Sequence, residues 1–215
     1  MKLYIYDHCP YCVRPRMIFG LKNIPVENIT LLNDDEKTPI GLVGKKMVPI
    51  LIKDDGSAMP ESLDIVRYID DNYGEKLLSE ETRSEFDNWV KKVGNYYYYL
   101  LHPRVIKLGL KEYVTETAVD YFIKKKTASI GSFNEHLAKS DEYIKQLEND
   151  LAELEKLFVS ESAFNGKLSF EDIILFPMLR NLTCVKGLIF PTKIKAYIER
   201  MSELTKIDLY TDRAI

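Results

Sequence analysis

The sequence is poor in the features that mark several specialised classes of protein. Among its 215 residues are three cysteines, three histidines and one tryptophan. An odd and small number of cysteines does not suit the disulfide framework of a small secreted domain, and it fits a reducing compartment. No apolar run approaches the roughly 18 residues of a membrane-spanning helix, and the amino terminus reads as a strand rather than as a signal peptide. We therefore expect a cytoplasmic protein with no membrane contact.

An excess of positive charge is also missing. The formal net charge is −3 and the pI is about 5.7. A protein that binds nucleic acid or anionic lipid through its charge needs a concentrated basic face, and this balance does not imply one. Hydrophobic residues make up 46% of the chain, an ordinary globular share. At 215 residues the chain can form one large core or two modest ones.

Two of the three cysteines lie close together near the amino terminus, at Cys9 and Cys12. Residues 2–6 form an apolar run typical of a strand, and residues 11–20 have the periodicity of a helix, with Pro10 suited to its first turn. Free N–H groups and the helix dipole at a helix start favour an anion, so the Cys9 thiolate should be stabilised. We expect Cys9 to be accessible and Cys12 to be less so, which suggests an attacking and a resolving thiol.

Other uses of the two thiols are less consistent with the sequence. A zinc site needs two further ligands, but Cys184, His102 and His136 are scattered singly. Haem attachment needs a histidine directly after the second cysteine, where the chain has Val13. A purely structural disulfide is typical of small secreted domains. Two inert buried thiols remain an alternative, although a C-x-x-C between a strand and a helix favours redox chemistry.

The remaining pattern predicts two domains. Further strands are expected at 26–32, 48–52 and 58–59, with helices at 38–43 and from 60–62 to about 72. The order β-α-β-α-β-β-α over residues 1–72 matches an α/β thioredoxin-like domain. A polar linker is expected at 73–83, followed by an all-helical domain over 84–215. Its helices are expected at 84 to about 110, bent or ended by Pro103, and at 115–130, 133–158, 171–185 and 191–204. Ser169 and Asp172 form a candidate capping box.

Several residues near or beyond the cysteine pair are open to more than one interpretation. His8 could lower the pKa of the Cys9 thiol as an imidazolium, but a surface position is favoured because adjacent residues often point apart. Arg14 and Arg16 could add positive potential near Cys9. Cys184 is expected to be a small buried hydrophobe, as free thiols usually are.

The C-P-Y-C at residues 9–12, Met17, Val48-Pro49 before a strand and Glu61-Ser62 at a helix start together resemble glutaredoxins. A thioredoxin-like domain followed by a helical domain with a capping box looks like the glutathione-transferase architecture. Together with the opening segment 1–12 and the late segment 175–183, the chain is similar to the bacterial type-two glutaredoxins over nearly its full length. Pro15 lies just past the first helical turn, an unexpected place for a proline. There it could remove one helical hydrogen bond and change the pitch of the helix.

This resemblance implies a glutathione-dependent thiol–disulfide oxidoreductase with a redox-active Cys9–Cys12 disulfide. It implies glutathione as a cosubstrate, no bound cofactor or metal, and disulfide-bonded or glutathionylated protein substrates. We expect a monomer, although the sequence leaves the oligomeric state open. The resemblance also implies a cis bond before Pro49, with the Val48 backbone pairing with the cysteinyl part of glutathione. Ser62 and the amides beside it would bind the γ-glutamyl carboxylate, Glu61 the ammonium group, and Pro10 and Tyr11 would complete the glutathione site. Taken alone, Ser62 could be a plain helix N-cap and Pro49 an ordinary turn residue.

Two rival functions remain open at this point. A glutathione transferase conjugating electrophiles would use the same architecture but has no role for Cys12. A non-enzymatic glutathione or iron–sulfur binding module commonly has glycine where this chain has Pro10, and lacks the second cysteine.

Overall fold

A computed structural model describes all residues, 1–215, and the chain divides into two compact units. The first, here called the sheet unit, comprises Met1–Lys76, Gly109–Lys125 and Thr205–Ile207. The second, the helical unit, comprises Leu77–Leu108, Lys126–Leu204 and Asp208–Ile215. The expected boundaries place residues 109–125 in the helical domain instead, because a helical pattern does not tell which unit a helix packs against. As a division into domains, 1–72, 73–83 and 84–215 stays a prediction.

A four-stranded sheet of order β2-β1-β3-β4 forms the centre of the sheet unit. Its strands are β1 (Lys2–Ile5), β2 (Glu27–Thr30), β3 (Ile50–Ile52) and β4 (Ala58–Met59). β1 runs parallel to β2 and antiparallel to β3, which is antiparallel to β4. The thioredoxin-like order of elements is thus confirmed, although β3 begins two residues later than expected. Pro49 has no N–H to donate to a ladder, so it precedes the strand rather than joining it.

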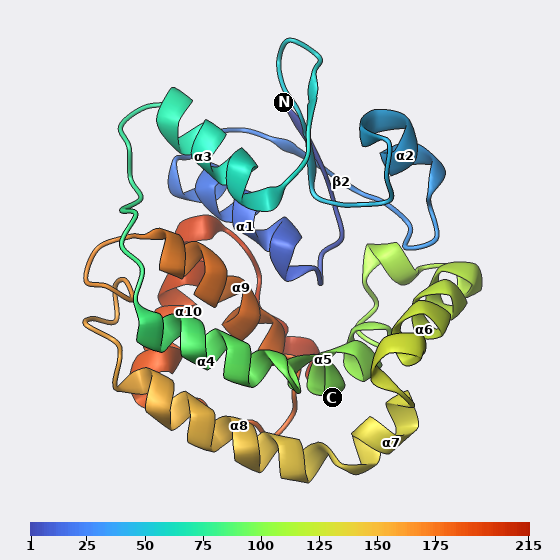
Figure 1. The fold of residues 1–215 in the computed structure, drawn as a ribbon, viewed down its shortest axis with the longest axis vertical. Coiled ribbons are helices and arrows are strands. Elements are labelled where there is room, and N and C mark those ends of the chain that lie inside the picture. The colour runs from blue at the N-terminus through green and yellow to red at the C-terminus, as the bar shows by residue number, and fades with distance from the viewer. The chain divides into compact units, whose positions relative to one another are not determined.

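Two helices of this unit lie side by side, α1 (Pro10–Leu21) and α3 (Ser62–Asn72), as Figure 1 shows in blue and cyan. Lys22, directly after α1, joins their carboxyl ends through a side chain that is 5% exposed. Its Nζ lies 3.0 Å from a carboxylate oxygen of Asp70 and donates to the carbonyl oxygens of Asp70 and Tyr73. The short helix α2 (Lys37–Val43) lies between β2 and β3 in sequence. The inner turns of α1 include Pro15, which is buried and removes one helical hydrogen bond without ending the helix.

The segment Thr205–Ile207, which follows most of α10, belongs to the sheet unit and packs against α1 at Gly20. A Cβ atom at Gly20 would lie 2.1 Å from the Thr205 carbonyl oxygen. The absence of a side chain at Gly20 therefore permits the close approach of the two backbones.

The helical unit differs from its prediction in the number of helices. It contains α4 (Ser84–Gly94), α5 (Tyr97–Val105), α7 (Phe133–Ala138), α8 (Ser140–Glu155), α9 (Phe170–Leu182), the greater part of α10 (Thr192–Thr205), the end of α6 (Glu116–Ile130), and the short η2 (Thr211–Arg213). The helices expected at 84–110 and 133–158 are each two helices, so those predictions were wrong. Breaks occur at Tyr96, whose hydroxyl reaches the buried Asp150 carboxylate, and at Lys139. Hydrophobic spacing continues through both breaks and cannot locate them.

The capping box at the start of α9 is confirmed. The Ser169 N–H donates to the Asp172 carboxylate at 2.9 Å. The other Asp172 oxygen accepts from the Phe164 N–H at 2.8 Å and from the Tyr197 hydroxyl at 3.0 Å. One carboxylate therefore fixes the start of the buried helix and its neighbours. No helix of the chain has both the length and the apolar composition needed to cross a membrane.

Candidate active site

The sheet brings three of the predicted site segments to one edge. β1 ends at Ile5, and the antiparallel register places Tyr4 opposite Ile50, so residues 48–49 enter beside residues 6–9. Leu51 pairs with Met59, so residues 60–62 leave at the same edge. The segments carrying Cys9, Val48-Pro49 and Glu61-Ser62 therefore emerge from neighbouring strands. The Val48–Pro49 peptide bond is cis, as expected from the resemblance.

The two thiols have unequal surroundings. Cys9 is the N-cap of α1, with extended backbone angles, and is partly exposed. Pro10 occupies the first turn, and Cys12 is completely buried. The Tyr6 N–H donates to the Cys12 sulfur at 3.4 Å, which ties the helix to the end of β1. The structure contains both cysteines as free thiols, and their difference in accessibility is the one expected.

Their acidities differ in the same sense. The pKa of Cys9 is lowered from 9.0 to about 6. The hydrogen bond from the Cys12 thiol lowers it most, burial opposes the shift, and the charge of His8 and the backbone amides of Cys12 and Tyr11 lower it further. The pKa of Cys12 is raised well above 9.0, chiefly by burial and then by its hydrogen bond to Cys9. At neutral pH this pair holds one thiolate and one thiol.

His8 is not on the surface, so the favoured prediction for this residue was wrong. It is 6% exposed, and its Nδ1 lies 2.8 Å from Oε1 of Glu112. The Tyr113 ring lies beside it, with ring centroids 5.3 Å apart. Glu112 and Tyr113 belong to a short 3-10 turn, η1 (Lys111–Tyr113), in the segment that packs with the sheet unit. No pattern around residue 112 identifies this turn as part of the site.

The arginines of α1 are directed to different partners. Arg14 donates from Nη1 to the Ser62 hydroxyl at 3.3 Å, and its guanidinium lies 4.5 Å from the centroid of the Tyr11 ring. Arg16 pairs with Asp7 at 2.8 Å. Arg14 therefore places a positive charge beside Ser62, which is a connection that the sequence did not reveal.

Ser62 itself is not a helix N-cap. Glu61 occupies the cap position with φ +70°, Ser62 is the first residue of α3, and no side chain caps this helix. The plain-cap interpretation of Ser62 is therefore wrong. Ser62 is largely buried, whereas Tyr11 and Glu61 are exposed and Val48 is partly exposed.

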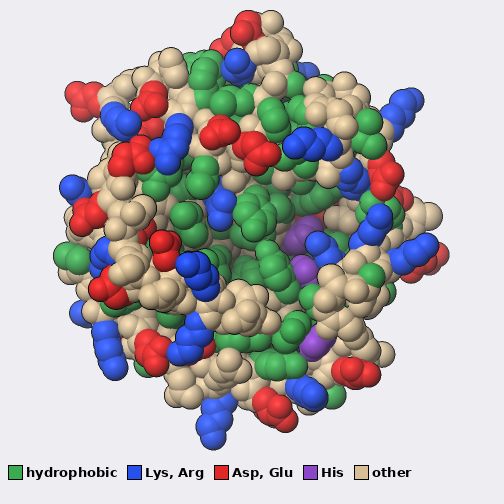
Figure 2. Space-filling model, viewed as in Figure 1, with side chains coloured by type: hydrophobic (Ala, Val, Ile, Leu, Met, Phe, Trp, Pro, Cys, Tyr) green, Lys and Arg blue, Asp and Glu red, His purple; other side chains and the backbone are tan.

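The third cysteine is a protonated thiol at neutral pH. Cys184 is completely buried, and burial raises its pKa to about 12. The chain has no group of three or more His, Cys, Asp or Glu side chains placed to hold a metal ion. On the face shown in Figure 2, acidic and basic side chains are interspersed, with no gathering of one sign.

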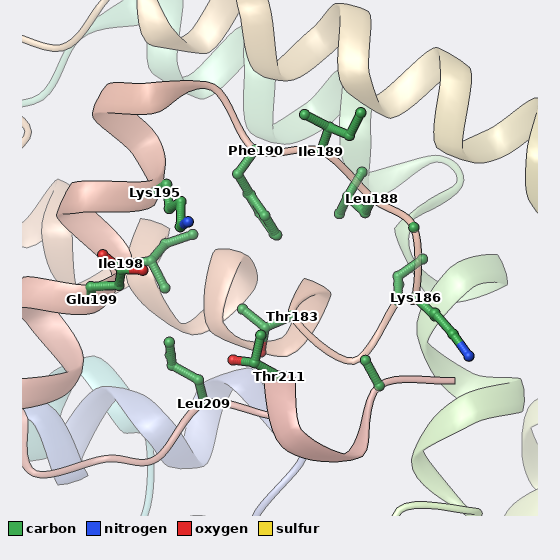
Figure 3. Close-up of a pocket in the computed structure, with 13 residues that line it drawn as sticks. Thr183, Lys186, Leu188, Ile189, Phe190, Lys195, Ile198, Glu199, Leu209 and Thr211 are labelled. Carbon is green, nitrogen blue, oxygen red and sulfur yellow. The ribbon is translucent and has the colours of Figure 1, made fainter.

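A cavity of about 510 Å³ lies within the helical unit, near the carboxyl terminus. Figure 3 shows the apolar side chains of Leu188, Phe190, Ile198 and Leu209 around it. None of the predicted site residues lines this cavity.

Comparison with known proteins assigns the family. Residues 85–214 match the family model described as "Glutaredoxin 2, C terminal domain", and residues 3–77 match "Glutathione S-transferase, N-terminal domain". Glutaredoxin 2 of Escherichia coli strain K12 is 51% identical over 215 residues, which is 100% of both chains. This chain belongs to the glutaredoxin 2 family. It is accordingly a glutathione-dependent thiol–disulfide oxidoreductase, with glutathione as cosubstrate.

Solved structures agree with this assignment. The crystal structure of Glutaredoxin 2 from Salmonella typhimurium in complex with glutathione superposes with a TM-score of 0.97 and 52% identity, covering 100% of this chain and 98% of that one. A glutathione transferase from Phanerochaete chrysosporium superposes with a TM-score of 0.73 at 14% identity, covering 97% and 98%. The second likeness is one of fold alone, and it confirms the expected glutathione-transferase-like architecture.

Proposed function

We propose that Cys9 is the attacking thiol of the family reaction and that Cys12 is the resolving thiol. The observation that carries this assignment is the opposite displacement of the two pKa values, to about 6 for Cys9 and well above 9.0 for Cys12. The thiolate is the nucleophile in thiol–disulfide exchange. Cys9 is also the more accessible of the two, so it meets a substrate first.

The proposed sequence of exchanges conserves thiols and electrons. The Cys9 thiolate attacks one sulfur of a substrate disulfide, the substrate S–S bond breaks, and the departing thiolate takes up a proton. On a protein disulfide, Cys12 then loses its proton and attacks the mixed disulfide, which releases the reduced protein and forms the Cys9–Cys12 bond. Two glutathione molecules reduce that bond and leave as glutathione disulfide. On a glutathionylated protein, Cys9 takes the glutathione and a second glutathione clears it.

We further propose that glutathione binds along the shared edge of the sheet. The Val48 backbone beside Pro49 would pair with its cysteinyl part, next to Pro10 and Tyr11. Ser62 and the free amides at the start of α3 would bind the γ-glutamyl carboxylate, and Glu61 the ammonium group. The position of Arg14 supports this arrangement, because its guanidinium already donates to Ser62 and adds positive charge where a carboxylate would lie.

We also propose protein substrates, an oligomeric state and a cellular location. The substrates would be disulfide-bonded and glutathionylated proteins, and the protein would act as a cytoplasmic monomer. A reducing compartment agrees with the three free cysteines.

Two serine variants test the assignment of the thiols, with glutathione reductase coupled to each assay. Cys9→Ser should abolish turnover of both a glutathionylated peptide and a protein disulfide. Cys12→Ser should keep the first activity and lose most of the second, because nothing then releases the tethered protein. Cys184→Ala is the matched control and should change neither. Wild-type activity of Cys12→Ser on protein disulfides, or activity of Cys9→Ser on either substrate, would contradict the proposal.

A further inference from the structure

A buried acid and a buried histidine meet one residue before Cys9, although they are 104 positions apart in the sequence. Oε1 of Glu112 accepts the backbone N–H of His8 at 3.0 Å and lies 2.8 Å from its Nδ1. His8 is 6% exposed and Glu112 is 0% exposed. A carboxylate can only accept hydrogen bonds, so a proton on Nδ1 is required by this contact. His8 immediately precedes Cys9, and its contact with Glu112 fixes both its backbone and its ring.

The charge of Glu112 needs a cation close by. Its second oxygen, Oε2, is buried and accepts no hydrogen bond. A buried carboxylate in that state is costly unless a positive charge is beside it. The Glu112 carboxylate and the Tyr113 phenol face His8 from η1.

The ring neighbours of His8 from the other elements are uncharged. The Tyr6 phenol stacks on its ring from the end of β1, and Cys9 follows it at the start of α1. From α6, Phe122 contributes only an uncharged edge, with ring centroids 5.4 Å apart. The nearby Arg16 is paired with Asp7. Among these groups, the ring of His8 is the one that can balance Glu112.

We propose that Glu112 holds the His8 ring as an imidazolium behind Cys9, and that this buried pair is a positioning device for the Cys9 thiolate. The inference rests on the proposed role of Cys9 as the attacking thiol. The lowered pKa of Cys9 agrees with this arrangement, because the charge of His8 is one of the causes that lower it, after the hydrogen bond from Cys12. Such a coupling is reciprocal, so the thiolate must stabilise the imidazolium as well. Loss of the thiolate on oxidation should therefore favour the neutral ring.

The first experiment measures the alkylation rate of Cys9 against pH in full-length protein, with mass spectrometry to count modified thiols. Glu112→Gln keeps an oxygen that can accept both His8 hydrogen bonds and removes only the charge. His8→Gln removes the ring. In each variant the midpoint should move from about 6 to roughly 7, which slows alkylation at pH 6 about fivefold. Glu116→Gln is the matched control, because it removes an equal charge from an exposed residue at the start of α6, and its midpoint should not move.

A purely structural role gives a different result. Folded Glu112→Gln and His8→Gln proteins that melt at a lower temperature but keep the wild-type midpoint would overturn the proposal. Such a result would leave the role of Cys9 intact, because that role is tested separately by turnover of the Cys9→Ser protein.

The second experiment needs no variant and so does not depend on folding of a mutant. The protein has three histidines, whose ring signals can be followed by NMR with isotope-labelled histidine. In reduced protein at pH 7, the His8 ring should show imidazolium chemical shifts. Oxidation to the Cys9–Cys12 disulfide should move them toward the neutral ring, with the His136 signals as an internal reference. A neutral His8 ring in the reduced protein, or no response to oxidation, would refute the coupling.

Discussion

The reduction potential of the Cys9–Cys12 pair should change its pH dependence near pH 6. Below about pH 6 both thiols of the reduced pair are protonated, so reduction consumes two electrons and two protons. Above it Cys9 is ionised while Cys12, whose pKa is raised, keeps its proton. Reduction then consumes one proton. Because the pKa of Cys9 is depressed, ionisation stabilises the reduced form above pH 6, and this stabilisation is lost as the pH falls through that value.

The expected slopes follow from the two-electron couple. A tenfold change in its equilibrium constant is about 30 mV, so from the two thiols alone the potential should fall by about 60 mV per pH unit below the break and by about 30 mV per pH unit above it. Any proton that His8 gains on reduction would steepen the upper slope. At pH 7 a thiol with a pKa of about 6 is roughly ten-elevenths ionised, which stabilises the reduced form by about 1.4 kcal/mol. That amount raises the potential by about 30 mV relative to a pair of ordinary thiols.

The measurement is an equilibrium titration against dithiothreitol redox buffers at a series of pH values from about 5 to about 8. Samples are quenched in acid and alkylated, and the reduced fraction is read by mass. Cys184→Ala serves as the control and should show the same break, because this buried thiol takes no part in the couple. A single slope of about 60 mV per pH unit through pH 8, with the His8 ring in the same protonation state in both redox forms, would mean that Cys9 is not ionised at neutral pH, and the electrostatic reasoning would fail.

Two further substitutions test the packing of α1 and the proposed glutathione site. Gly20→Ala should lower the free energy of unfolding by about 1–3 kcal/mol in urea titrations, because its Cβ would lie 2.1 Å from the Thr205 oxygen. Gly41→Ala, in α2 with nothing within 4 Å, should leave stability unchanged or raise it by up to about 1 kcal/mol, and equal effects of the two changes would refute the packing argument. Ser62→Ala should reduce glutathione-dependent turnover about tenfold or more, from the loss of a charge-assisted bond of roughly 1.5–3 kcal/mol, and spare reduction by a small dithiol. Equal losses with both reductants would remove Ser62 from the site.

Most elements of the sheet unit could be predicted from local sequence. The strand before Cys9, the helix after Pro10 and the turn before Ser62 are each set by residues within a few positions, so their order could be read directly. Helix length was less predictable. A hydrophobic stripe continues across Tyr96 because that side chain is buried too, and at the break its hydroxyl donates to Asp150, which lies 54 positions away.

The surroundings of Cys9 could not be predicted from local sequence. Adjacency in sequence suggested that His8 points away from Cys9 toward solvent, but burial of a polar side chain is decided by whether a partner is available. That partner, Glu112, arrives in a segment that the helical pattern assigned to the other domain. Glu112 has no exposure and meets His8 only after the chain has folded, so neither residue carries a local signal of the pair.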